Sequence, residues 1–182
     1  MKFLPEFGIF WMNGFLFILP MLFIRLTLPK LMKRQTSNKL DYFPPVIGIE
    51  RIALKAYFIL NTTIVFSPLL FHVRFENTII VLIFIICYSL GIIILTLSVI
   101  TFSESNSITT KGIYKYSRNP MYIAYFLIYL AVALSVGSIL FLVIVILYQV
   151  AVHFLILSEE RWCKENFKEA YNTYCAKVNR YL

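Results

Sequence analysis

Two long apolar runs without a single charged residue constrain this sequence most. One run covers 78–102 and has 25 residues, and the other covers 121–157 and has 37. The hydrocarbon core of a bilayer is about 30 Å thick, so about 20 helical residues cross it. A helix also satisfies its backbone hydrogen bonds internally, as lipid requires. Both runs therefore predict membrane-spanning helices.

The longer run exceeds what one helix needs to cross a bilayer, so it predicts a tight hairpin with its turn at Gly137 and Ser138. Two further apolar blocks precede 78–102. We therefore expect an all-α integral membrane helical bundle with about five transmembrane helices in a single domain, 1–182. The expected spans are 8–24, 52–71, 78–102, 121–136 and 139–157, followed by a C-terminal amphipathic helix within 158–182.

The polar segments between the spans are basic, which predicts the orientation of the chain. The segments 25–51, 103–120 and 158–182 contain six, three and five lysine and arginine residues. The segments on the other side of the membrane contain two, Lys2 and Arg74. Short segments rich in lysine and arginine stay in the cytoplasm, so the excess of fourteen basic residues over two predicts that the loop 103–120 and the tail 158–182 are cytoplasmic. Within 25–51, prolines at 29, 44 and 45 are expected to prevent a long helix.

The composition narrows the class of partner. Only 14% of the residues are charged, against about 25% in soluble domains. The net charge of +8 is explained by topology and anionic headgroups, and no groove-reading motif accompanies it, so a bilayer and not a nucleic acid is the expected partner. Three cysteines without CxxC spacing and two histidines predict no metal site.

A dense polar segment lies directly before the predicted hairpin. Residues 111–122 contain one glycine, three tyrosines, an arginine and an Asn-Pro turn. Pro120 suits the first turn of the following helix, and Asn119 suits its cap. Two interpretations remain open. The helix start can bind a small anion or carboxylate, or the segment can be an interfacial aromatic belt with a snorkelling arginine.

A second polar group follows the hairpin. Glu159 and Glu160 are adjacent, with Arg161 as a possible partner, and Gln149, His153 and Glu160 form a stripe on the last span. Ionisable groups in a span usually mark function, although His153 is near enough to the helix end to reach the interface. Both ends of a hairpin lie on one side of the membrane, so we expect the two polar groups to converge on one ligand.

The order and spacing of these motifs resemble the isoprenylcysteine carboxyl methyltransferase and phospholipid methyltransferase superfamily, over about 103–182. The matching residues are Gly112, Tyr114, Ser117, Arg118, Asn119, Pro120, Met121 and Tyr122, then Glu159, Glu160, Phe167, Tyr171, Tyr174, Val178 and Arg180. The resemblance implies a membrane methyltransferase that uses S-adenosylmethionine, with the cofactor at the cytosolic mouth between 103–122 and 158–182.

Position by position, the resemblance implies cofactor contacts from the residues of both motifs. These are Tyr114, Asn119, Pro120, Met121, Tyr122 and Glu159, together with Arg118, which with Arg180 is expected to shape the loop and tail. The stretch 106–109 falls where the family has further cofactor contacts. Several positions depart from the family pattern. Asn119 stands where histidine is frequent, Lys168 where a glycine is usual, Asn179 where a proline is frequent, and Leu155 where the prenylcysteine enzymes have an arginine.

The expected reaction is methyl transfer to a lipophilic or small acceptor. Leu155 cannot bind a carboxylate, so an amine or thiol acceptor is favoured, with His153 or Glu160 as catalytic general base. The sequence does not name the acceptor. The alternatives are an NADPH-dependent membrane reductase of the sterol or enone type, which shares a similar hairpin, and a non-catalytic membrane scaffold.

Overall fold

The computed structural model describes residues 1–8, 13–31, 44–75, 77–104 and 108–181. Within these ranges the fold is all-α, as predicted, and no sheet is formed. The helices are α1 (Leu19–Leu31), α3 (Ile49–Phe66), α4 (Thr78–Glu104), α5 (Pro120–Val136) and α6 (Ile139–Lys177), with the short 3₁₀ turns η1 (Gly14–Phe17), η2 (Ser67–Leu70) and η3 (Gly112–Lys115).

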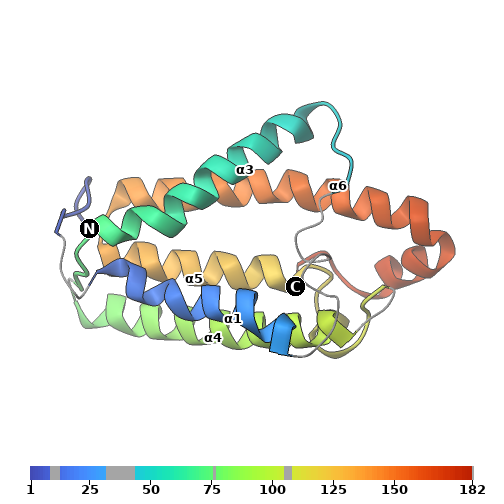
Figure 1. Cartoon of the computed structure of the whole chain (residues 1–182), viewed down its shortest axis with the longest axis horizontal. Helices are drawn as coiled ribbons and strands as arrows, with labels where there is room; N and C mark the ends of the chain where they lie inside the picture. Colours follow the sequence, from blue (N-terminus) through green and yellow to red (C-terminus); the bar gives the residue numbers. More distant parts are fainter. Residues whose placement is uncertain (9–12, 32–43, 76, 105–107, 182) are drawn as a thin grey trace.

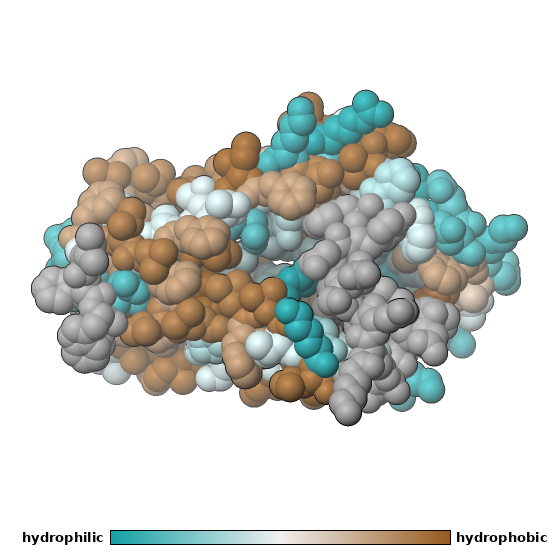
Figure 2. Space-filling view, in the orientation of Figure 1, coloured by the Kyte–Doolittle hydropathy of each residue, from teal (hydrophilic) through white to brown (hydrophobic). Residues whose placement is uncertain are grey.

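Four helical stretches are long and apolar enough to cross a membrane: Gly14–Leu31, Ile49–Leu70, Thr78–Ser103 and Ile139–Lys177. The remaining helix, α5, is apolar but has 17 residues. The outer surface of the helices carries many exposed isoleucine, leucine and phenylalanine side chains, which Figure 2 shows as brown areas. The chain is therefore a multi-pass integral membrane protein, and the prediction of about five spans is confirmed for four of them.

The helices form two layers, with α5 between its neighbours (Figure 1). Helix α3 lies along α6, and α4 lies along both α1 and α5. Helix α5 is the most buried element because it contacts α4 on one side and α6 on the other. The contact with α4 is close at Gly91, where a Cβ atom would lie 2.7 Å from Cγ1 of Ile128. Small residues at such points let membrane helices approach each other.

The two ends of the bundle have different roles. At one end, the N-terminal segment meets the α5–α6 turn, where the Lys2 backbone N–H donates to the Gly137 carbonyl over 2.9 Å. At the other end, the α4–α5 loop meets the C-terminal tail, where the Arg118 backbone N–H donates to the Asn179 carbonyl over 3.0 Å. The loop and tail therefore share one end of the bundle, opposite Met1, as the hairpin and the basic segments predicted (Figure 1).

The predicted hairpin is confirmed at its turn. Gly137 ends α5 in the left-handed conformation, with φ of 66°, which glycine adopts without steric cost. Ser138 begins α6, and its Oγ accepts a hydrogen bond from the Phe141 backbone N–H over 3.2 Å. The predicted helices 78–102, 121–136 and 52–71 correspond closely to α4, α5 and the pair α3 and η2.

The predicted end of the first span at residue 24 is wrong. Helix α1 continues to Leu31 with Pro29 inside it, so Arg25 lies in the middle of a helix and not in a polar loop. The extension is possible because Arg25 finds a partner on another span, Tyr125, to which it donates over 2.8 Å. Residues 9–12 of the expected span and 32–43 of the expected basic loop lie outside the described residues.

The predicted boundary between the last span and a separate tail helix is also wrong. Helix α6 runs through Ser158 without interruption, and the break comes at Lys168, with φ of 44° and ψ of −117°. The chain reverses there, so the last residues return along α6. Tyr181 thereby reaches His153, whose Nδ1 is 2.6 Å from the tyrosine hydroxyl.

Replacing Lys168 by glycine should stabilise the protein. A lysine at positive φ is strained, and glycine, which the family usually has at this position, removes that strain, for a gain of about 1 kcal/mol. Thermal unfolding in detergent should therefore shift upward for Lys168→Gly. The matched control is Lys164→Gly, at an exposed position in the regular part of α6, which should lose about 1 kcal/mol. A loss in both variants would contradict the assigned strain.

Candidate active site

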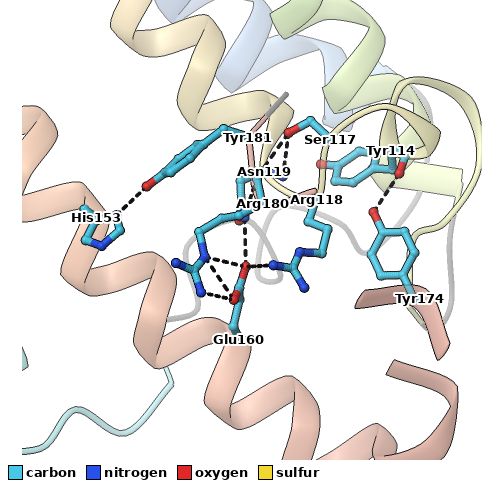
Figure 3. A network of polar contacts seen from close by, with 9 residues as sticks. All are labelled: Tyr114, Ser117, Arg118, Asn119, His153, Glu160, Tyr174, Arg180 and Tyr181. Carbon is cyan, nitrogen blue, oxygen red and sulfur yellow. Dashed lines mark hydrogen bonds and ion pairs between the residues drawn. The ribbon is translucent and has the colours of Figure 1, made fainter. Parts of the chain in front are cut away.

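The buried carboxylate of Glu160 is the centre of the site (Figure 3). Oε2 of Glu160 accepts from Nη2 of Arg180 over 2.9 Å and from Nε of Arg180 over 3.1 Å. Oε1 is 3.3 Å from Nη2 of Arg118 and accepts from Nδ2 of Asn119 over 3.3 Å. The tail, the loop and α6 are thus joined at one side chain, which Figure 3 shows lying between the two guanidinium groups.

Burial makes these ion pairs necessary. The side chain of Glu160 is 6% exposed and that of Arg118 is 12% exposed, so neither charge is solvated by water. An unpaired charge in such a place is costly, and pairing offsets that cost. The hydrogen bond from Arg180 to Glu160 raises the pKa of that guanidinium, which lies outside the spans and stays charged.

Further hydrogen bonds hold the loop against the tail. The Arg180 carbonyl accepts from Nδ2 of Asn119 over 3.1 Å and from Oγ of Ser117 over 3.3 Å. The Tyr174 hydroxyl donates to the Tyr114 carbonyl over 2.7 Å, and burial raises the pKa of the Tyr114 hydroxyl, which therefore remains neutral. Two backbone segments about 60 residues apart are fixed together in this way.

Asn119 occupies the expected position directly before α5 but does not cap the helix with its side chain. Its amide is used by Glu160 and by the tail, and its own backbone N–H donates to Oγ of Ser117 over 3.1 Å. Pro120 stands in the first turn of α5, as predicted. The first three residues of α5, which come directly after Asn119 in the chain, are Pro120, Met121 and Tyr122.

Glu159 has a different environment from its neighbour. The Tyr122 hydroxyl of α5 donates to Oε1 of Glu159 over 2.5 Å. Glu159 therefore faces α5, whereas Glu160 faces the loop and tail. Arg161, expected as a partner of these carboxylates, instead pairs with Glu50 of α3, with Nη2 donating to Oε2 over 2.8 Å. Arg161 pairs with Glu50 because α3 packs along α6 and brings Glu50 to the end of the span.

The expected stripe of Gln149, His153 and Glu160 is divided between two environments. Glu160 is bound by the arginines, and His153 contacts Tyr181 through Nδ1. Oε1 of Gln149 is buried without a hydrogen-bond partner among the described residues. Tyr181 was not predictable as the partner of His153, since the contact depends on the chain reversal at Lys168.

At this end of the bundle, three buried polar atoms have no hydrogen-bond partner among the described residues: Oγ of Ser103, Oγ1 of Thr109 and Nε of Arg118. Buried polar atoms of this kind also occur elsewhere, at Ser67 and Gln149. Buried polar groups are normally hydrogen-bonded, so such atoms point to a polar ligand in this loop. Thr109 belongs to the stretch 106–109 that was expected to contact a cofactor. Residues 106 and 107 of that stretch lie outside the described residues.

A row of tyrosines extends from this site into the spans, and the sequence did not predict it. Tyr125 and Tyr129 of α5, Tyr148 of α6 and Tyr57 of α3 follow one another, with ring centroids 6.3, 5.2 and 5.6 Å apart. The four residues are named the tyrosine row below. They come from three helices, so no sequence spacing connects all of them.

Comparison with known proteins places this sequence in a family. The sequence profile of the family described as phospholipid methyltransferase matches residues 77–170, just over half of the chain. The chain belongs to the phospholipid methyltransferase family. The predicted superfamily is thereby confirmed, and members of this family are membrane methyltransferases that use S-adenosylmethionine. Searches of curated proteins and of solved structures found no match.

Neutralising Glu160 should destabilise this end of the protein. Glu160→Gln leaves the two arginines beside each other without their counter-charge, at a cost of about 3 kcal/mol. The tail should detach, so trypsin should cleave after Lys177 faster, and unfolding in detergent should occur at lower temperature. The control is Glu165→Gln, at an exposed position on the same helix, which should change stability by less than about 0.5 kcal/mol. Equal behaviour of the two variants would argue against this role.

Proposed function

We propose that this protein transfers a methyl group from S-adenosylmethionine to a lipophilic acceptor that enters from the bilayer. The observation that carries the proposal is the meeting of the two family motifs at one end of the bundle, through Asn119 and Glu160 over 3.3 Å and through Tyr122 and Glu159 over 2.5 Å. Membership in the methyltransferase family supports it independently.

The residues at this end fit the proposed donor. S-adenosylmethionine supplies a methyl group on a cationic sulfonium. The aromatic faces of Tyr114 and Tyr122 can hold a cation, and Glu159 can accept hydrogen bonds from a ligand. The unpaired Thr109 Oγ1, Ser103 Oγ and Arg118 Nε offer further polar contacts in the loop. In this proposal, the remaining contacts to the methyl donor come from Asn119, Pro120 and Met121.

The chain's own contribution to catalysis is alignment and exclusion of water. In this proposal, Glu160 positions the loop and tail through its arginines, because both of its oxygens are already occupied. His153 remains the proposed general base. Its Nδ1 is engaged by the Tyr181 hydroxyl, so Nε2 is the ring atom proposed to accept a proton from an amine or thiol.

The family name suggests a phospholipid amine as the first acceptor to test. A second reason is Leu155, which is fully buried and apolar where the prenylcysteine enzymes have an arginine. We expect the purified protein, incubated with methyl-labelled S-adenosylmethionine and membrane extract, to label a lipid. This incubation is the test of the proposed function.

We further propose that all five helices of this single domain cross the membrane and that the site faces the cytoplasm. Helix α5 runs the same course as α4 and α6, from the site to the opposite end (Figure 1). The test uses single cysteines at Leu4, Lys111 and Lys177, which are exposed, after replacement of the native cysteines. An impermeant maleimide should label Lys111→Cys and Lys177→Cys only in inverted vesicles, and Leu4→Cys only in right-side-out ones. Labelling of Lys111→Cys and Lys177→Cys from opposite sides would refute the shared site.

Donor binding should depend on Glu159 and not on His153. We expect a Kd of about 1 μM for S-adenosylmethionine or its demethylated product. Glu159→Gln removes a charged acceptor and should weaken binding by about 1.5–3 kcal/mol, measured by calorimetry. His153→Ala should bind the donor normally and transfer the methyl group more slowly.

The same calorimetry separates the rival functions. Binding of NADPH in place of S-adenosylhomocysteine would indicate a reductase, and binding of neither would indicate a scaffold. Unchanged donor binding in Glu159→Gln, with the Glu165→Gln control also unchanged, would remove Glu159 from the donor site.

A further inference from the structure

Tyr181 belongs to the tail but contacts a span. Its ring packs against the apolar core between the helices, and its hydroxyl oxygen is 2.6 Å from Nδ1 of His153 on α6. The centroids of the two rings are 6.1 Å apart, with 30° between the ring planes. Figure 3 shows the tyrosine extending from the tail to the histidine. The tail therefore reaches the proposed general base directly.

The residues before Tyr181 are held by the site described above. Arg180 donates to the Glu160 carboxylate through Nε and Nη2, and the Arg180 carbonyl accepts from two side chains of the α4–α5 loop. The carbonyl of residue 179 accepts from a backbone N–H of the same loop over 3.0 Å. The place of the Tyr181 hydroxyl is thus set by the loop and by α6 together.

The contact decides what each nitrogen of the imidazole ring can do. A neutral imidazole has one N–H donor and one acceptor nitrogen, and the partner of one nitrogen fixes the role of the other. Nδ1 of His153 has the Tyr181 hydroxyl as its partner. Nε2 has no hydrogen-bond partner among the described residues, so it is the nitrogen that a ligand can use.

Two arrangements of hydrogen atoms fit this contact. In the first, Nδ1–H donates to the Tyr181 oxygen, and Nε2 keeps its lone pair. In the second, the hydroxyl donates to Nδ1, and Nε2 carries a hydrogen for which the described residues offer no acceptor. Inside proteins, an N–H without an acceptor is rarer than an acceptor without a donor, and a tyrosine O–H can rotate toward another partner. The first arrangement is therefore favoured.

The carboxylates at this end of the bundle have other partners. Glu160 is held by the arginines of the loop and tail, and Glu159 receives the hydroxyl of a tyrosine on α5. Glu50 of α3 is paired with an arginine of α6. In serine hydrolases a carboxylate holds the catalytic histidine in one tautomer, whereas here a neutral tyrosine hydroxyl is the group in reach of Nδ1.

We propose that Tyr181 is a positioning residue that holds the ring of His153 with its hydrogen on Nδ1 and with Nε2 open to the acceptor. When the nucleophile of the acceptor bonds to the methyl carbon, the carbon–sulfur electron pair stays on sulfur and the nucleophile's proton passes to Nε2. The ring then has two N–H groups, and Nδ1–H still donates to the Tyr181 oxygen, so the ring need not turn. The role of His153 as base rests on the proposed function, whereas the hydrogen bond and its direction do not.

The first test observes the ring nitrogens in the absence of donor and acceptor. The chain has two histidines, so nitrogen NMR of histidine-labelled protein gives few signals, and His153→Ala assigns those of His153. At a pH where the ring is neutral, we expect the hydrogen of the wild type on Nδ1. Tyr181→Phe keeps the aromatic ring and removes the oxygen, so its signals should show a mixture of both tautomers. A wild-type hydrogen on Nε2, or identical signals in wild type and Tyr181→Phe, would overturn the proposal.

Tyr174→Phe is the matched control. Tyr174 is another tyrosine of the same segment, and its hydroxyl donates to the Tyr114 carbonyl over 2.7 Å, so this variant also loses one hydrogen bond. It should unfold at lower temperature, as Tyr181→Phe should, and leave the His153 signals unchanged. A change of these signals in both variants would indicate a general loosening of the tail and contradict the specific role of Tyr181. If Tyr181→Phe does not fold, the tautomer of the wild type decides alone.

The second test uses the acceptor identified by methyl labelling. Tyr181→Phe should slow methyl transfer about tenfold, as expected for the loss of one hydrogen bond, with the Kd of S-adenosylmethionine unchanged. In the His153→Ala background the same substitution should have no further effect, because Tyr181 acts through the ring. An equal loss in both backgrounds would overturn the inference and leave the proposed function intact. Absence of methyl transfer in the wild type would overturn the proposed function, and the NMR signals would still decide on the hydrogen bond.

Discussion

The arrangement of this end of the protein depends on one buried carboxylate. Glu160 joins segments that are 41 and 20 residues away in the chain, because two arginines and an asparagine amide reach it from the loop and the tail. A buried charge must be paired, so the tail has to return to α6. That return requires a sharp reversal, which explains why Lys168 adopts a conformation that lysine normally avoids.

Most of the helix boundaries were predictable, because bilayer thickness acts directly on sequence. Uncharged length located α4 and α5, and Gly137 located the turn between α5 and α6. The errors fall where a charged residue continues a helix. The first span was expected to end at residue 24 and the last at residue 157, but the helices continue through Arg25 and Arg161, whose partners Tyr125 and Glu50 are 100 and 111 residues away. No local pattern contains such partners, so hydropathy ended the first helix too early and divided α6 into a span and a separate tail helix.

The candidate site was predictable to the extent that it follows from the hairpin. The two helices of a hairpin return to the same side, so α5 and the part of α6 that packs beside it bring Asn119 and Glu160 together, and the contact is present. The individual interactions were less predictable. The side chain of Asn119 was expected to cap α5, but a cap is a weak interaction compared with a hydrogen bond to a buried carboxylate. The tyrosine row is formed by residues of three helices, so no spacing within the sequence predicts it.

The two adjacent glutamates show how one helix can serve two purposes. Successive residues of an α-helix differ in direction by about 100°, so neighbours cannot face the same partner. Glu160 faces the arginines, whose charges fix it in place. Glu159 faces the neutral hydroxyl of Tyr122, which orients its carboxyl group. Burial raises the pKa of Glu159 to about 7, well above the usual value of a carboxyl group. The helix thereby carries one carboxylate that holds the fold together and one carboxyl group whose ionised form a bound cation would favour.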